Sequence, residues 1–202
     1  MYLNPGTPWQ GATVAVLGSG PSMSLKVADS VKHLPRIVLN TTYQLAPDAD
    51  YIYAADPMWW IWATEQLWWD HSSKGWKMTM ESRSRQHPNV PKEIGVMRYG
   101  GLHGFDDRPG YLRSGGNSGY QALHLAASMG AARILLFGFD CHGGHWHGDH
   151  PDKLGNPMAS TYAGWIRNFT SLAPLLRERG IEVVNCTPGS KLECFQPMEL
   201  AA

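Results

Sequence analysis

The chain has 202 residues, of which 43% are apolar, and its 17 basic and 17 acidic side chains give a formal net charge of zero. This length is enough for one domain with a full hydrophobic core, and neutrality removes the overall field that would attract nucleic acid or an anionic membrane. No apolar run approaches the roughly 20 residues of a membrane span, and the segment after Met1 does not resemble a signal peptide. Three cysteines are more typical of a reducing cytoplasm than of a disulfide scaffold. We therefore expect a cytoplasmic protein without a membrane partner.

Predicted strands alternate with predicted helices along the chain. Short apolar runs predict strands at residues 13–17, 36–39, 51–54, 77–80, 95–98, 134–137 and 181–185. Helices are predicted at residues 25–34, 120–129 and 160–179, and each is followed by a proline or glycine that stops it. This alternation predicts a Rossmann-like α/β fold, with a mostly parallel sheet and helices on both faces, in a single domain of residues 1–202.

Residues 57–114 are a predicted insertion that is rich in tryptophan and in loop residues. The tryptophans crowd into its first part and are Trp59, Trp60, Trp62, Trp68 and Trp69. Aromatic side chains at this density favour burial in the core or at a subunit interface, so a homo-oligomer formed through this segment is one expectation. Stacking on a base or a sugar is the alternative.

A glycine-rich segment follows the first predicted strand and consists of Gly18, Ser19, Gly20, Pro21 and Ser22. Glycine lets the backbone turn tightly and approach a ligand, and the amides of the next helix suit a phosphate. The segment lacks the third glycine of the dinucleotide fingerprint and the Gly-Lys-Ser/Thr of a Walker A loop. A plain strand-to-helix turn capped by Ser22 is the alternative.

A second glycine-rich segment, residues 115–119, precedes the next predicted helix. It contains Asn117, Ser118 and Gly119, and it again offers free helix amides with a small hydroxyl. Helix capping alone would explain Asn117 or Ser118. Two such segments in one small α/β domain predict a pair of anion-binding loops.

A cluster of histidines follows the strand at residues 134–137. Its chemistry-bearing side chains are His142, His145, His147, Asp149 and His150. The string from His145 to His150 fits the HxHxDH motif of metallo-β-lactamase-type hydrolases, but no later histidine completes that metal site, which excludes that fold. Three readings remain: a catalytic group, since imidazole with a pKa of about 6.5 suits a general base, a local metal site of His145, His147, Asp149 and His150, or a solvated loop.

Two carboxylates each follow a predicted strand. Asp56 and Asp140 stand where a carboxylate can bind ribose hydroxyls, Mg²⁺ or a basic side chain. Asp140 could instead cap a loop, and Asp56 precedes a proline and could begin a turn.

The order of these motifs resembles two related groups, the family 42 sialyltransferases, which use a CMP-sugar, and the MptE-like group related to 6-hydroxymethylpterin diphosphokinase, which uses ATP and Mg²⁺. The matching segments are VAVLGSGPS, IVLNTTY, YAAD, NSGYQALHLAASMGAARILLFGFD and VVNCTPGSKL. They cover most of the chain apart from residues 59–114. The size and the HWHGDHP segment are most similar to small phage- or prophage-borne members, which would act in the host cytoplasm.

The resemblance implies roles for the glycine-rich loops and their neighbours. It implies nucleotide contacts by Gly18, Ser19, Gly20, Pro21, Ser22, Asn40, Asp56, Asn117, Ser118, Gly119 and Asp140. In the sialyltransferases a catalytic histidine lies well after the segment that corresponds to Asp140, whereas no histidine here follows His150. His145, His147 or His150 would have to replace it.

These observations lead to one main expectation of function and three alternatives. The main expectation is a nucleotide-dependent transferase, glycosyltransferase-like, with a nucleotide-sugar donor and an unidentified acceptor. The alternatives are a diphosphokinase with ATP and Mg²⁺ or another divalent metal, a non-catalytic module that sequesters nucleotide, and a metal-dependent hydrolase built on the histidine cluster.

Overall fold

In the computed structural model, which describes residues 2–65, 75–81, 92–151 and 154–198, nine parallel strands form one sheet in the order β6-β5-β4-β3-β2-β1-β7-β8-β9. The strands are β1 (Thr13–Leu17), β2 (Arg36–Leu39), β3 (Tyr51–Tyr53), β4 (Trp76–Met80), β5 (Gly95–Tyr99), β6 (Tyr111–Leu112), β7 (Arg133–Phe137), β8 (Glu182–Asn185) and β9 (Gln196–Pro197). The longest register joins β1 to β7, from Thr13 beside Arg133 to Leu17 beside Phe137.

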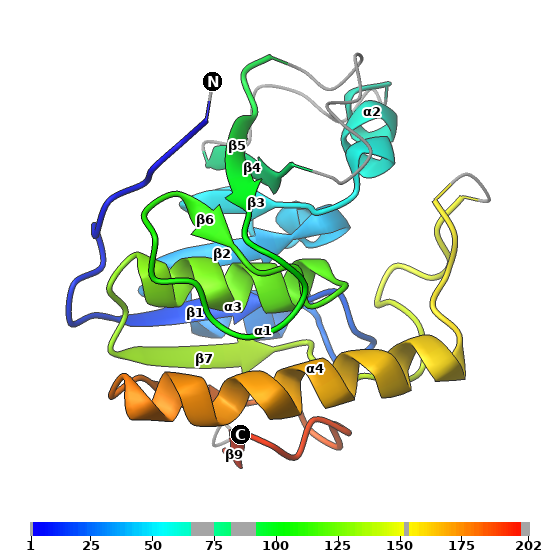
Figure 1. Cartoon of the computed structure of the whole chain (residues 1–202). Coiled ribbons are helices and arrows are strands. Elements are labelled where there is room, and N and C mark those ends of the chain that lie inside the picture. The colour runs from blue at the N-terminus through cyan, green and yellow to red at the C-terminus, as the bar shows by residue number, and fades with distance from the viewer. Residues whose placement is uncertain (1, 66–74, 82–91, 152–153, 199–202) are drawn as a thin grey trace.

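Helices cover both faces of this sheet (Figure 1). One face carries α1 (Leu25–Ser30), the 3₁₀ helix η1 (Asn40–Gln44) and α2 (Pro57–Glu65), and the other carries α3 (Ser118–Ser128) and α4 (Ala159–Glu178). A hydrophobic core lies on each face of the sheet, and successive residues of β1 point to the two cores alternately. Val14 and Val16 pack with α3, while Ala15 and Leu17 pack on the α1 face. The Rossmann-like α/β fold predicted from the sequence is confirmed.

The structure adds short elements that the sequence pattern missed. Strands β6 and β9 have two residues each, and η1 follows β2 directly. Two residues are too few to show an alternation of apolar side chains, so these strands are recognised only by their pairing with a neighbouring strand. Helix α1 ends at Ser30, four residues earlier than expected, with its start capped by the Ser24 hydroxyl, which accepts from Val27 N at 3.3 Å.

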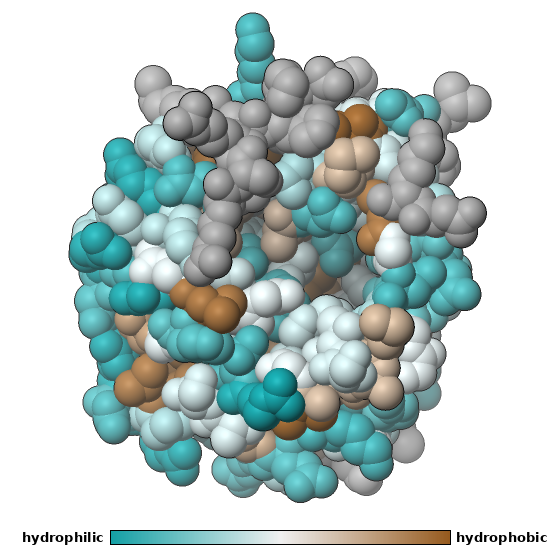
Figure 2. Space-filling view, turned by 45° about the vertical axis from the view of Figure 1, so that its right-hand side comes forward, coloured by the Kyte–Doolittle hydropathy of each residue, from teal (hydrophilic) through white to brown (hydrophobic). Residues whose placement is uncertain are grey.

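The order in which strands are added to the sheet reverses at β1, which pairs with β2 on one side and with β7 on the other. After β1 the chain turns to the α1 face, and after β7 it turns to the α4 face, so the two connections diverge. In open α/β sheets this divergence leaves a crevice beyond the carboxyl ends of the strands. Those ends point to the right in Figure 1, and Figure 2, turned to bring that side forward, shows a hollow there.

No helix in the described ranges is both long enough and apolar enough to cross a membrane.

Candidate functional site

Two adjoining hollows open at the carboxyl ends of the central strands. The first, of about 110 Å³, lies between the loop after β1 and helix α4, and the second, of about 380 Å³, continues toward α2. Both are lined by Asn40, Asn117, Ser118, His145, Pro157 and Trp165. Because small-molecule sites commonly measure about 300–1,000 Å³, the two hollows form a site large enough for a small ligand.

The predicted glycine-rich loop after β1 bonds through its backbone to the end of β7 and to the residue that follows it. Gly18 N donates to Phe137 O at 2.6 Å, and Gly20 N donates to Gly138 O at 2.9 Å. A Cβ on Gly18 or Gly20 would collide with the Gly138 carbonyl. These glycines therefore permit a close approach between two loops, and their own amides are occupied by it.

The polar side chains of this loop bond to the protein. The Ser19 hydroxyl donates to Leu39 O at 3.1 Å and lies 3.0 Å from the Thr42 hydroxyl. Ser22 donates to the Asp140 carboxylate twice, from its amide at 3.1 Å and from its hydroxyl at 2.9 Å. Asp140 is 3% exposed, and burial raises its pKa although the two Ser22 bonds lower it.

The predicted nucleotide-binding residues of these two loops fall into two groups, those that line a hollow and those that do not. Gly18, Ser19 and Gly20 line the first hollow, whereas Pro21, Ser22 and Asp140 line neither hollow. Asp140 instead fixes the loop after β1 to the loop after β7. Nucleotide contact by these six residues stays a prediction.

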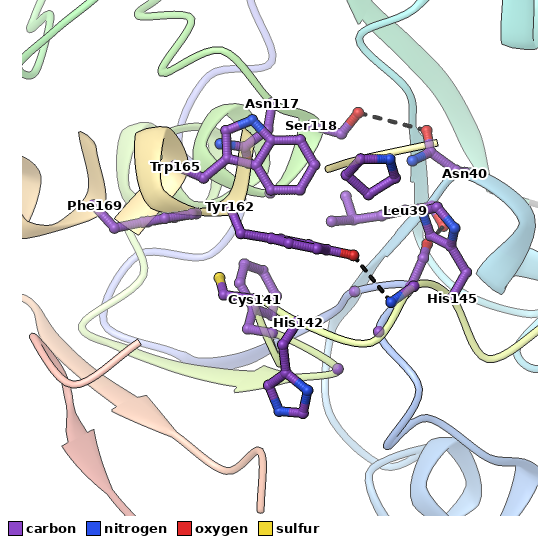
Figure 3. A pocket seen from close by; sticks show the side chains of 18 residues that line it. Leu39, Asn40, Asn117, Ser118, Cys141, His142, His145, Tyr162, Trp165 and Phe169 are labelled. Atoms are coloured by element: carbon purple, nitrogen blue, oxygen red, sulfur yellow. Dashed lines mark hydrogen bonds between the residues drawn. The ribbon is translucent and has the colours of Figure 1, made fainter. Parts of the chain in front are cut away.

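The start of α3 faces both hollows, as the second glycine-rich segment predicted. Asn117 caps the helix, since its side-chain oxygen accepts from Tyr120 N at 2.8 Å. The Ser118 hydroxyl accepts from Ala55 N at 3.0 Å and donates to the Asn40 side-chain oxygen at 3.5 Å (Figure 3). The first amides of a helix have no acceptor within it and carry the positive end of its dipole, so this wall suits an anion.

Backbone strain gathers at the first hollow. Asn40, with φ 47°, and Cys141, with φ 56°, are the two non-glycine residues with positive φ in the described part of the chain, and both line it. Such conformations cost of the order of 1–3 kcal/mol and cluster at functional sites. The strain is independent support for a site at this place, and the sequence carried no sign of it at Cys141.

Aromatic side chains from α4 form the adjoining wall of the first hollow, and sequence reasoning missed them. Tyr162 and Trp165 are half-buried, with ring centroids 5.4 Å apart at an interplanar angle of 88°, and Phe169 lies buried beyond them (Figure 3). The Tyr162 hydroxyl accepts from Gly144 N at 3.0 Å, and Trp165 Nε1 donates to Gly116 O at 3.1 Å. Their i, i+3, i+7 spacing puts them on one helix face, which was the available signal.

The three histidines predicted to be catalytic come together beside the second hollow. The ring centroids are 5.1 Å apart for His145 and His147, 4.3 Å for His145 and His150, and 4.8 Å for His147 and His150. His145 and His150 line the second hollow. His142 does not belong to this group of three: it is exposed and lines the first hollow.

Burial keeps these imidazoles uncharged near neutral pH. Burial, with a smaller contribution from neighbouring histidines of the cluster, lowers the pKa of His147 and of His150 to about 4. The pKa of His145 is also lowered by burial, against a raising effect of Asp149. Neutral imidazole is the form that accepts a proton or binds a metal.

The two remaining acidic residues of the predicted site lie apart from one another. Asp56 is exposed and lines the second hollow, and its Oδ1 accepts from Met58 N at 2.8 Å, as in the alternative in which it begins a turn. Asp149 is exposed, and its carboxylate does not join the imidazole nitrogens that converge in the described chain. The four-residue metal set predicted from the sequence is thus brought together only in its three histidines.

Comparison of the chain with models of protein families, with curated proteins and with solved structures gives no match.

Proposed function

We propose that this protein is a nucleotide-dependent transferase, glycosyltransferase-like, that takes a nucleotide-sugar donor. One observation carries the proposal: the start of α3 and the aromatic side chains Tyr162 and Trp165 of α4 line the same hollow. A nucleotide offers a phosphate to the first and a flat base or a sugar to the second. The strained backbone of Asn40 and Cys141 at the same place favours a functional site over a plain turn.

The walls indicate how such a donor would be held. None of the described residues that line the two hollows is lysine or arginine. Phosphate would be met by the amides of Ser118 and Gly119 and by the side-chain amide nitrogen of Asn40. Donors preorganised in this way stabilise the charge that develops on a leaving nucleotide.

The second hollow is where an acceptor hydroxyl would react. In the transfer, the acceptor oxygen bonds to the anomeric carbon, the bond from that carbon to the nucleotide phosphate breaks, and the hydroxyl proton passes to a base. Asp56 is the only carboxylate among the described residues of this hollow, and we expect its second carboxylate oxygen to take that proton.

A binding screen tests the nucleotide site. Thermal unfolding is measured with CMP, UDP, ADP and GDP and their sugar derivatives, and with inorganic phosphate alone. We expect one nucleotide to raise Tm, because a ligand that binds only the folded state stabilises it. Trp165→Ala should weaken its affinity by roughly 10-fold to 100-fold, since stacking on one base contributes about 1–3 kcal/mol.

The matched control is Trp76→Ala, since Trp76 is 67% exposed and lies outside both hollows. It should bind nucleotide as the wild type does. Absence of stabilisation by every nucleotide at millimolar concentration would overturn the proposal. Release of free nucleotide from the bound sugar donor, followed by mass spectrometry, then tests transfer, which Asp56→Asn should slow without weakening donor binding.

A metal-dependent hydrolase is the second candidate, and the convergence of the three imidazoles favours it. A metal ion can polarise a bond and activate water. The two candidates differ in the screen: a hydrolase of this kind requires no nucleotide, and its activity would be lost on chelation and restored by the metal.

A further inference from the structure

Three imidazole rings of one loop meet, and each has a buried nitrogen without a partner among the described residues. One ligand nitrogen from each of His145, His147 and His150 lies within 4.8 Å of the others. His145 Nδ1, His147 Nε2 and His150 Nδ1 are closed off from solvent and have no hydrogen-bond partner among the described residues. Leaving a buried polar atom unpaired costs about 1–3 kcal/mol, so three of them in one place call for a ligand that they share.

We propose that His145, His147 and His150 form a binding site for a divalent transition-metal ion, with Zn²⁺ as the reference ion. Imidazole nitrogen is a preferred ligand of Zn²⁺, and three histidines suffice for a site that keeps a coordination position open. Bond lengths of about 2.0–2.1 Å at tetrahedral angles put the nitrogens about 3.4 Å apart. The rings therefore need to close by at most about 1.5 Å, which side-chain rotation can supply.

Two sets of hydrogen bonds hold the loop that carries the histidines. Trp146, between two of the ligands, donates from its amide to Ser19 O and from Nε1 to the Thr42 hydroxyl, both at 3.1 Å. His150 and Asn156 bond to each other twice, since His150 N donates to Oδ1 at 2.9 Å and Asn156 Nδ2 donates to His150 O at 3.3 Å. These anchors preorganise the cluster, as a metal site requires.

A turn in the loop lies between the first ligand, His145, and the third, His150. Gly148 N donates to His145 O at 3.1 Å, and Gly148 itself has φ 84°, a left-handed conformation that glycine adopts without strain. The chain thus turns between His145 and Gly148, directly before the segment that carries His150.

The open coordination position would belong to the second hollow. His145 and His150 line this hollow together with Asp56 and Asn40. An ion held by three protein ligands completes its coordination with water or with an oxygen atom of a ligand in the hollow. The ion would lie beside the place assigned to the acceptor. Binding of the ion goes beyond the proposed function and does not depend on it.

The test measures metal binding directly, on the full chain and without nucleotide. Protein freed of metal by EDTA and dialysis is titrated with Zn²⁺ and with Co²⁺, by calorimetry and by the visible absorption of bound Co²⁺. We expect about one ion per chain, with the bands of four-coordinate Co²⁺. Because loss of an outer-shell partner alone typically costs 10–100-fold, each of His145→Ala, His147→Ala and His150→Ala should weaken binding by at least about 100-fold.

His142→Ala is the matched control, because it removes an exposed imidazole of the same loop and should leave the affinity unchanged. The proposal is overturned if the wild type binds neither ion at about 0.1 mM, if the three variants bind like the wild type, or if His142→Ala loses as much. Circular dichroism of each metal-free variant should match that of the metal-free wild type, which shows that the variant is folded.

A second set of variants keeps the test decisive if an alanine variant fails to fold. His150→Gln and His147→Gln retain size and polarity but lose the imidazole, and both should lose the ion. His147 lines neither hollow, so its variants should keep nucleotide affinity. Loss of the metal with nucleotide binding intact supports this site alone, whereas metal binding without any nucleotide binding overturns only the proposed transferase.

Discussion

At the scale of single residues, Asp140 shows how a side chain at a strand end can serve the fold. Its carboxylate is buried and accepts both bonds from Ser22. Placement after a buried strand is typical of ligand-binding carboxylates, and the loop-capping alternative was equally open from the sequence. The observed contacts are those of the capping alternative, and a nucleotide contact stays a prediction.

We expect Asp140→Ala to lower the free energy of unfolding by about 1–3 kcal/mol, because it leaves the Ser22 amide and hydroxyl without their acceptor. Asp140→Asn should cost less, since its amide oxygen still accepts from Ser22 N and no charge is buried. Urea unfolding of the three proteins measures both differences. Equal stability of the alanine variant and the wild type would contradict the bracing role.

At the scale of elements, α2 is held by its tryptophans. Trp60 is fully buried and its Nε1 donates to Ala54 O at 2.9 Å, while Trp59 Nε1 donates to the Thr41 hydroxyl at 3.2 Å. Their rings pack edge to face with centroids 4.9 Å apart. The expectation of burial in the core is confirmed for these two, and Trp68 and Trp69 lie outside the described residues.

Replacement of Trp60 by alanine should reduce the free energy of unfolding by about 3–5 kcal/mol, the usual cost of removing a large buried aromatic side chain. Trp76→Ala, at a site that is 67% exposed, should change it by less than about 0.5 kcal/mol. Denaturant titration followed by circular dichroism, which does not rely on the removed fluorophore, makes the comparison. Similar losses in both variants would show that α2 is not anchored through Trp60.

At the scale of the whole molecule, the buried side chain of His124 makes the stability of the fold sensitive to acid. Arg113 N donates to His124 Nδ1 at 2.9 Å, and His124 Nε2 lies 3.2 Å from both the amide nitrogen and the carbonyl oxygen of Asp106. Burial is the main cause that lowers the pKa of His124 to about 4; Asp106 and Asp107 oppose it, and Arg113 adds to it. A proton on Nδ1 would displace the Arg113 bond.

The unfolded chain binds a proton at this histidine below a pH of about 6.5, whereas the folded protein does so only below about 4. The stabilisation is complete above pH 6.5 and is lost as the pH falls toward 4, by about 3 kcal/mol in total. His124→Asn keeps an acceptor for Arg113 N and should remove this part of the pH dependence. Urea unfolding from pH 4 to 7 measures it, and parallel curves for both proteins would refute it.

Much of the framework could be predicted from local sequence. Runs such as residues 13–17 and 36–39 are apolar after their first residue because parallel strands are covered on both faces, and they became β1 and β2 with the same bounds. The segment containing Asn117 was recognisable as a helix start because capping is a local interaction. Such features depend on neighbours within a few residues.

The sequence by itself determined the Rossmann-like sheet, the two glycine-rich loops and the presence of a histidine cluster at one strand end. Only the tertiary structure decided that Tyr162 and Trp165 form a wall of the site, that Asp140 bonds to Ser22, and that three imidazoles converge while Asp149 stays outside. The physical reason is that the direction of a loop side chain depends on backbone angles and anchors from distant segments. Trp146, bonded to Ser19 and Thr42, is such an anchor.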